Sequence, residues 1–147
     1  MTGQREDASS QLSFDRMVVA DVMTIDPVTV TVDATVEDAE QLLATYRISG
    51  LPVVDATGHL VGVLSRTDLL LEGGPGLSRL LRGRESGLRV GELMSSPPIT
   101  VGMSTTLSAA ARLMRDQRVH RLVIVNDHDQ PIGVLSATDF VQLIADG

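Results

Sequence analysis

The stretch Gly62-Val63-Leu64-Ser65-Arg66-Thr67-Asp68 of this 147-residue chain returns later as Gly133-Val134-Leu135-Ser136-Ala137-Thr138-Asp139. It closes a longer repeat, because residues 19–69 align with residues 90–140 at a constant offset of 71, without insertion or deletion. Seventeen of the fifty-one aligned pairs are identical, whereas unrelated sequences of average composition would share about three or four. Polar as well as apolar positions recur, so the repeat predicts a duplicated surface site on a duplicated fold.

Each copy of the repeat is predicted to form a β-α-β-β-α unit behind a short lead-in helix at 18–23 or 90–94. Residues 27–32 and 98–103 alternate at the strand period, and Thr35 and Thr106 then cap amphipathic helices. The remaining elements, two strands and a closing helix in each copy, are expected at 51–54, 60–64 and 65–71 and at 122–125, 132–135 and 136–145.

The size of one repeat bears on how the copies are arranged. A single unit has too little core to be stable alone, so we expect an α/β (α+β) fold with two repeats packed sheet to sheet about a pseudo-two-fold axis. The divisions are a flexible tail at 1–17, repeat 1 at 18–71, a linker at 72–88 and repeat 2 at 89–147. Gly62 and Gly133, inside strands, indicate that another segment approaches the backbone closely there.

Composition excludes several classes of function. There is no cysteine, and no P-loop or metal-spaced His and carboxylate pair, so we expect no catalytic residue, no bound metal and no enzyme. The net charge of −7 and the three aromatic residues disfavour nucleic acid and anionic membranes as partners. Without a signal peptide or membrane-spanning stretch, a cytoplasmic location is expected.

The repeated Ser-x-Thr-Asp phrase lies where a strand ends and a helix begins, and it has two interpretations. Ser65, Thr67 and Asp68, with Ser136, Thr138 and Asp139, could bind a nucleotide, since hydroxyls donate to phosphate and an aspartate accepts from a sugar diol. Alternatively, serine and aspartate form a capping box that serves only stability. The sequence leaves both open.

A second polar cluster precedes the middle strand of each copy. Ser49 and Gly50 occupy it in repeat 1, and His120 and Arg121 in repeat 2, where the guanidinium could hold a phosphate. A solvated loop is the alternative. His59 and His128 lie in turns and are predicted to be ordinary surface residues.

These features together resemble a tandem CBS-domain protein, or Bateman module, that stands alone. The resemblance covers residues 18–145 and rests on Val22-Met23, Leu93-Met94, Ile48-Ser49-Gly50-Leu51-Pro52-Val53-Val54-Asp55, Val119-His120-Arg121-Leu122 and the two Ser-x-Thr-Asp phrases. It implies a regulatory module that senses AMP, ADP, ATP or S-adenosylmethionine in clefts between the repeats. The nucleotide would be a regulatory ligand, with no catalytic cofactor.

The resemblance also implies which residues line each cleft. One cleft would combine Ser136, Thr138 and Asp139 with Thr24, Ile25, Ser49 and Gly50. The other would combine Ser65, Thr67 and Asp68 with Ser95, Ser96, His120 and Arg121. Because the cluster before the middle strand has diverged, the clefts should be unequal, with the second the better phosphate site. Val123 also departs from the family's usual proline, which repeat 1 keeps as Pro52.

Partners follow from the same resemblance. A homodimer and an unidentified protein partner are expected besides the nucleotide. The main alternative is a ligand-free domain for dimerisation or protein docking, in which the Ser-x-Thr-Asp phrases act as helix caps alone.

Overall fold

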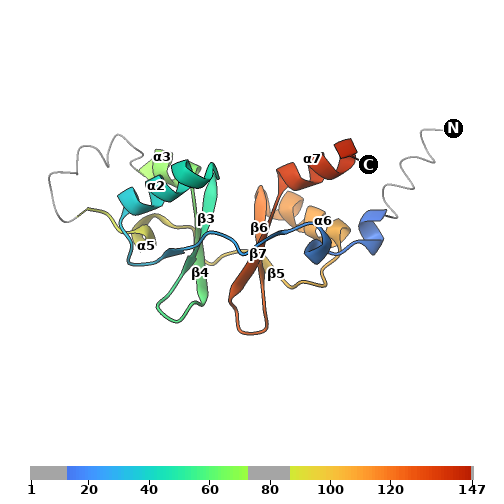
Figure 1. The fold of residues 1–147 in the computed structure, drawn as a ribbon, viewed down its shortest axis with the longest axis horizontal. Helices are drawn as coiled ribbons and strands as arrows, with labels where there is room; N and C mark the ends of the chain where they lie inside the picture. The colour runs from blue at the N-terminus through green and yellow to red at the C-terminus, as the bar shows by residue number, and fades with distance from the viewer. Residues whose placement is uncertain (1–12, 73–86, 147) are drawn as a thin grey trace. The chain divides into compact units, whose positions relative to one another are not determined.

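The computed structural model describes residues 13–72 and 87–146, which form two compact units. Unit 1 combines residues up to 26 with 99–127 and 132–147, and unit 2 combines 27–98 with 128–131. Most of the predicted tail and linker, residues 1–12 and 73–86, lies outside the described residues. Each unit therefore contains segments from both sequence repeats (Figure 1).

Unit 2 is built on a three-stranded sheet in the order β2-β3-β4. The first two strands are parallel, and the last two form an antiparallel hairpin. The strands are β2 (Val30–Thr31), β3 (Gly50–Val54) and β4 (Leu60–Ser65), and the helices are α2 (Val36–Tyr46), α3 (Arg66–Glu72) and α5 (Val90–Leu93). In Figure 1 the hairpin loop lies at the opposite end of the strands from α2 and α3.

Unit 1 is built on a four-stranded sheet in the order β1-β7-β6-β5. Its elements in chain order are η1 (Val19–Asp21), β1 (Thr24–Ile25), β5 (Thr100–Val101), α6 (Leu107–Gln117), β6 (Arg121–Val125), β7 (Pro131–Ser136) and α7 (Ala137–Asp146). Two sheets with flanking helices confirm the predicted mixed α/β class.

The helices α2 and α6 begin where the sequence predicts, and both end at an arginine. The hydroxyls of Thr35 and Thr106 accept hydrogen bonds from the backbone N–H groups of Asp38 and Ala109, both at 3.1 Å. Arg47 and Arg118 end the two helices in the left-handed conformation, with φ of 52° and 56°. Such a residue directs its N–H back to the last carbonyls, which closes the helix.

Each unit has its own hydrophobic core. In unit 2 the core joins Leu51 and Leu64 of the hairpin to Leu43 of α2. In unit 1 it joins Leu122 and Leu135 of the sheet to Met114 of α6 and Val19 of η1. These positions follow the apolar periodicities of the sequence, so the middle strands and the first helix of each repeat form as predicted.

The segments at the start of each repeat, 17–25 and 88–96, which we call the lead-ins, match the prediction only in part. The second contains the predicted short helix, as α5. The first is a 3-10 turn followed by β1 instead of a helix over 18–23, and β2 and β5 cover only two residues each. Pro27 and Pro98 lack the N–H that a longer ladder needs. The first lead-in pairs with repeat 2, since Leu107 N donates to Met17 O at 2.9 Å, and the second pairs with repeat 1, since Val36 N donates to Leu88 O at 3.0 Å. The lead-ins are thus exchanged between the repeats.

Candidate functional site

The start of α3 in unit 2 carries the first Ser-x-Thr-Asp phrase. The Ser65 N–H donates to Asp68 Oδ2 at 2.9 Å, and the Asp68 N–H donates to Ser65 Oγ at 3.1 Å. This reciprocal pair is a capping box, so the predicted cap geometry is present at this phrase. Thr67 takes no part in the box, and its side chain is exposed.

The second lead-in brings the Ser95 hydroxyl to this point and the Ser96 hydroxyl to the beginning of β4. Ser95 Oγ donates to Asp68 Oδ1 at 3.2 Å, and Ser96 Oγ donates to the carbonyl of Val61 at 3.0 Å. Both serines are exposed. Five of the predicted site residues therefore lie together in unit 2, and we call them the Asp68 cluster: Ser65, Thr67, Asp68, Ser95 and Ser96.

The position of Ser95 is fixed through the backbone. Ser95 N and Val63 O, and Val63 N and Ser95 O, are hydrogen-bonded at 2.9 and 3.0 Å. A Cβ at Gly62 would lie 2.6 Å from Met94 Sδ and 2.9 Å from Ser95 O. Only glycine allows this approach, so the prediction that another segment lies close to Gly62 is confirmed.

Unit 1 repeats this arrangement around the second phrase. Ser136 N donates to Asp139 Oδ2 at 2.7 Å, and Asp139 N donates to Ser136 Oγ at 3.3 Å, which is a second capping box. Thr24 and Ile25 pair with Val134 and Gly133 of β7. Thr24 and Ile25 therefore lie on the strand that leads into Ser136, in the same unit as Thr138 and Asp139.

The cluster before the middle strand lies beside the phrase of its own repeat. Gly50 pairs with Ser65 across the hairpin, and the Ser49 carbonyl accepts from Arg66 N at 3.0 Å. The His120 carbonyl accepts from Ala137 N at 2.8 Å. The groupings of Ser49 and Gly50 with Asp139, and of His120 and Arg121 with Asp68, join different units and stay predictions.

The charge at Arg121 is maintained although its side chain is half-buried. Burial lowers the pKa of the Arg121 guanidinium. An arginine guanidinium is so strongly basic that it stays protonated at neutral pH. Arg121 therefore provides a permanent positive charge near an exposed imidazole, His120.

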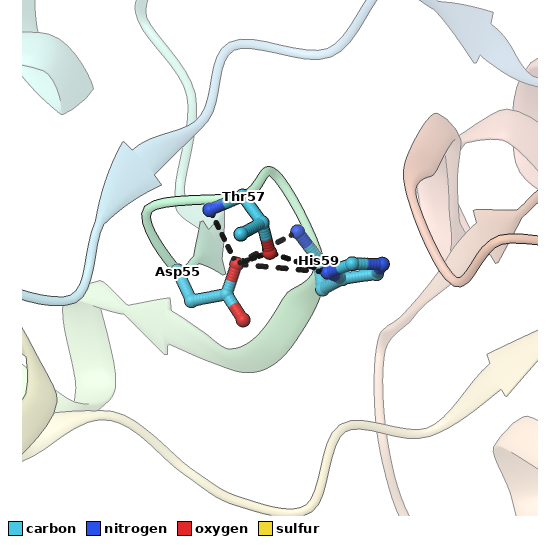
Figure 2. Close-up of polar contacts among 3 residues, drawn as sticks. All are labelled: Asp55, Thr57 and His59. Atoms are coloured by element: carbon cyan, nitrogen blue, oxygen red, sulfur yellow. Dashed lines mark hydrogen bonds and ion pairs between the residues drawn. The ribbon is translucent and has the colours of Figure 1, made fainter.

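The hairpin between β3 and β4 ends in a polar cluster away from these sites (Figure 2). Asp55 Oδ1 accepts from Thr57 N, Thr57 Oγ1 and His59 N at 2.9, 2.6 and 3.0 Å. The Thr57 hydroxyl is the main cause that lowers the pKa of Asp55. His59 is exposed, as predicted, and its contacts hold the turn. Among residues 13–72 and 87–146, no three His, Cys, Asp or Glu side chains could share a metal ion.

A comparison with protein families matches both repeats. The sequence matches the CBS domain over residues 19–73 and again over residues 90–146. The chain belongs to the CBS-domain family. The Asp68 cluster and its counterpart at Asp139 are thus equivalent positions of two CBS repeats.

Solved CBS structures share this fold. The chain is 34% identical to the CBS-pair protein CBSX2 of Arabidopsis thaliana, with a TM-score of 0.75 and coverage of 88% of this chain and 95% of that one. CBSX2 has also been crystallised in complex with AMP, in a structure at 35% identity that covers 88% of this chain and 97% of that one. The CBS domain of a membrane protein from Sphaerobacter thermophilus aligns over 97% of this chain and 96% of that one, at 25% identity and a TM-score of 0.80.

Curated relatives include much longer enzymes. The inosine-5'-monophosphate dehydrogenase of Mycobacterium tuberculosis is 34% identical over 121 residues, which is 82% of this chain and 21% of the enzyme. That of Aquifex aeolicus is 32% identical over 121 residues, 82% of this chain and 23% of the enzyme. The chain thus spans about a fifth of the length of these relatives. Within the part of the chain that the structure describes, no helix is long and apolar enough to cross a membrane.

Proposed function

We propose that this chain is a non-catalytic regulatory module that binds an adenosine nucleotide at its Ser-x-Thr-Asp clusters and transmits the binding to a protein partner. The observation that carries the proposal is the convergence of Asp68 and the exchanged Ser95 on one exposed edge of unit 2. AMP in the related CBSX2 supports an adenosine nucleotide as the ligand. ADP, ATP and S-adenosylmethionine are the other candidates.

The chemistry of the Asp68 cluster suits the ribose end of such a ligand. The capping box leaves unused acceptor sites on Ser65 Oγ and on the Asp68 carboxylate. A hydroxyl oxygen has two acceptor lone pairs, and a carboxylate has about four acceptor sites. A ribose diol can donate to Asp68 Oδ1 by replacing or sharing the Ser95 hydroxyl. Thr67, Ser95 and Ser96 add hydroxyl donors for phosphate, and a charge-assisted bond contributes about 1.5–3 kcal/mol.

The equivalent site in unit 1 has a different charge. Thr24, Ile25, Ser136, Thr138 and Asp139 repeat the ribose end, and His120 and Arg121 stand where unit 2 has the neutral Ser49 and Gly50. The His120 carbonyl accepts from Ala137 N at 2.8 Å, beside the second phrase. We therefore propose that His120 and Arg121 serve the Asp139 site, whereas the family resemblance groups them with Asp68. We therefore propose that the two sites differ most in their affinity for phosphate. The planar guanidinium of Arg121 can donate two parallel hydrogen bonds to a phosphate, and such a charge-assisted pair is directional and strong.

The exchanged lead-ins provide a route for transmission. Ser95 lies against Asp68, and four residues later the chain resumes unit 1 at Ile99. A ligand that displaces the Ser95 hydroxyl acts on the segment that connects the two units. It changes the conformation of the module only if it binds one conformation better than another. The proposed output is a change in affinity for a protein partner, made by a homodimer.

A ligand-free docking domain is the second candidate, and one observation favours it. Both capping boxes are complete without a ligand, so Asp68 and Asp139 already have a structural role. Under this candidate, substitution of either aspartate would lower stability and change nothing else.

Isothermal titration with AMP, ADP, ATP and S-adenosylmethionine separates the two candidates. We expect Asp68→Asn and Asp139→Asn each to weaken one site by about tenfold or more, as expected when a charged hydrogen bond is lost. Asp38→Asn is the matched control, because Asp38 completes a capping box with Thr35 on α2, outside the proposed sites. No heat and no melting shift with any of the four compounds would refute nucleotide binding and leave the docking domain.

A further inference from the structure

A hollow on the surface of unit 1 borders the second Ser-x-Thr-Asp phrase. It lies between α6 and α7, and its volume is about 410 Å³. Ala137 and Phe140 of its lining are the chain neighbours of the threonine and the aspartate of this phrase. His120, also in the lining, is joined to this point because its carbonyl accepts from Ala137 N at 2.8 Å. Small-molecule sites commonly measure about 300–1,000 Å³, so the hollow has the size of a further compartment of the proposed nucleotide site.

The inside of the hollow is apolar and its edge is cationic. Met114 and Phe140 form two of its walls, and Met114 is only 6% exposed. The Phe140 ring packs edge-on against Phe14, with ring centroids 6.1 Å apart, and this contact supports the wall. Arg115 pairs with Asp116 at 2.9 Å, but both side chains are exposed and such a pair is weak. A positive edge therefore remains for an anionic ligand, from Arg115, Arg118 and His120.

The equivalent positions of repeat 1 have different side chains. Ala111 and Ala137 line the hollow with single methyl groups, and at the offset of 71 they correspond to Glu40 and Arg66. Long charged side chains at these positions fill space that alanine leaves open, and a glutamate carboxylate disfavours an anionic ligand. We therefore expect the additional compartment in unit 1 alone.

We infer that the unit 1 site takes an adenosine 5'-phosphate whose phosphate is esterified to an acyl-sized apolar chain, with that chain in the hollow. The inference rests on the proposed nucleotide site at Asp139 and specifies its ligand class. Asp139 accepts from the ribose diol, His120 and Arg121 hold the phosphate, and the walls between α6 and α7 bury the chain. Acyl adenylates have this composition.

The ribose contact excludes the other common carrier of an acyl group on adenosine. In a coenzyme A ester the ribose carries a 3'-phosphate, and an ionised aspartate accepts hydrogen bonds but repels a second anion. Asp139 therefore selects a ribose with both hydroxyls free.

Two alkyl esters of AMP test the inference by isothermal titration. The methyl and hexyl esters are stable, carry the same single phosphate charge and differ only in chain length. Burial of one methylene group favours binding about fourfold, so we expect the hexyl ester to bind at least about tenfold more tightly than the methyl ester. Equal affinities would overturn the inference and leave the proposed nucleotide site in place. If neither the esters nor AMP binds, the nucleotide site is refuted and the inference with it.

A variant places the gain in affinity at the hollow. Ala111→Trp fills the hollow, so the ratio of the two affinities should fall to less than about threefold. This ratio does not depend on a general loss of affinity, because both esters use the same ribose and phosphate contacts. Ala56→Trp is the control, because Ala56 is exposed in the hairpin turn of unit 2, outside the hollow. If Ala111→Trp keeps the full ratio, the chain binds elsewhere and the inference is wrong.

Titration with hexanoyl-coenzyme A tests the ligand class. We expect it to bind at least about tenfold more weakly than the hexyl ester of AMP, because its 3'-phosphate faces Asp139. Tighter binding of the coenzyme A ester would contradict the assigned class.

Discussion

Gly62→Ala is expected to displace the second lead-in from β4. The added Cβ would lie 2.6 Å from Met94 Sδ and 2.9 Å from Ser95 O. The methionine side chain can rotate, but the carbonyl belongs to the backbone that holds Ser95 to Val63 through bonds of 2.9 and 3.0 Å. The substitution must therefore lengthen those bonds or strain the strand.

The size of the effect follows from these two contacts. Overpacking a well-filled site costs about 1–3 kcal/mol, and each backbone hydrogen bond contributes about 1 kcal/mol. We expect the free energy of unfolding to fall by about 2–4 kcal/mol, a large fraction of a typical domain's stability. Because Ser95 would move from Asp68, the proposed nucleotide affinity should fall as well.

Urea denaturation followed by circular dichroism provides the measurement. Gly102→Ala is the matched control, because a Cβ there meets no heavy atom within 4 Å. Its expected change is at most about 1 kcal/mol and towards higher stability. If Gly62→Ala and Gly102→Ala differ by less than about 1 kcal/mol, the close approach of the lead-in does not limit stability, and the reasoning is refuted.

Three further predictions use other features of the chain. Cleavage at a protease site inserted between residues 72 and 87 should give two fragments that elute together on size exclusion, because each unit contains segments of both fragments. Separation of the fragments would contradict the exchange of the lead-ins. The pKa of Asp55 is lower in the folded than in the unfolded state, where it is about 4, so Asp55 contributes stability above that value and the contribution is lost as the pH falls through the folded pKa. Thr57→Val removes the main cause of the lowered pKa and should reduce the loss of stability on acidification. An unchanged dependence of stability on pH would contradict this prediction. Double-mutant cycles of ATP affinity can pair His120→Ala with Asp68→Ala and with Asp139→Ala. His120 should be coupled to the aspartate that lies in the same site, and equal coupling to both aspartates would contradict two separate sites.

The sequence predicted the parts of the fold that depend on strong local patterns. Thr35 and Thr106 cap their helices as expected, and the alternation in the β3–β4 hairpin places Leu51 and Leu64 in the core. The glycine at position 62 correctly predicted that another segment, the second lead-in, approaches β4 closely. Two-residue strands such as β1 have no periodicity, so neither their pairing nor the exchanged lead-ins could be derived from local pattern.

The candidate site was predictable in its residues and only partly in its contacts. The repeated Ser-x-Thr-Asp phrases were identified by recurrence, and the capping boxes follow from their spacing. The Ser95–Asp68 bond joins positions 27 residues apart, so the family resemblance grouped these two residues but local pattern alone does not.

The exchanged lead-ins also set an order for folding during synthesis. Thr24 leaves the ribosome 110 residues before Val134, its partner on β7. At about 5–20 residues per second, the wait is about 5–20 s. During that interval the apolar Val19 and Met23 have no completed core to enter, because that core includes Leu135 of β7 and Phe140 of α7. The first lead-in therefore depends on β7 and α7 for its burial, and a product truncated before β7 would expose Val19 and Met23 to chaperones and proteases.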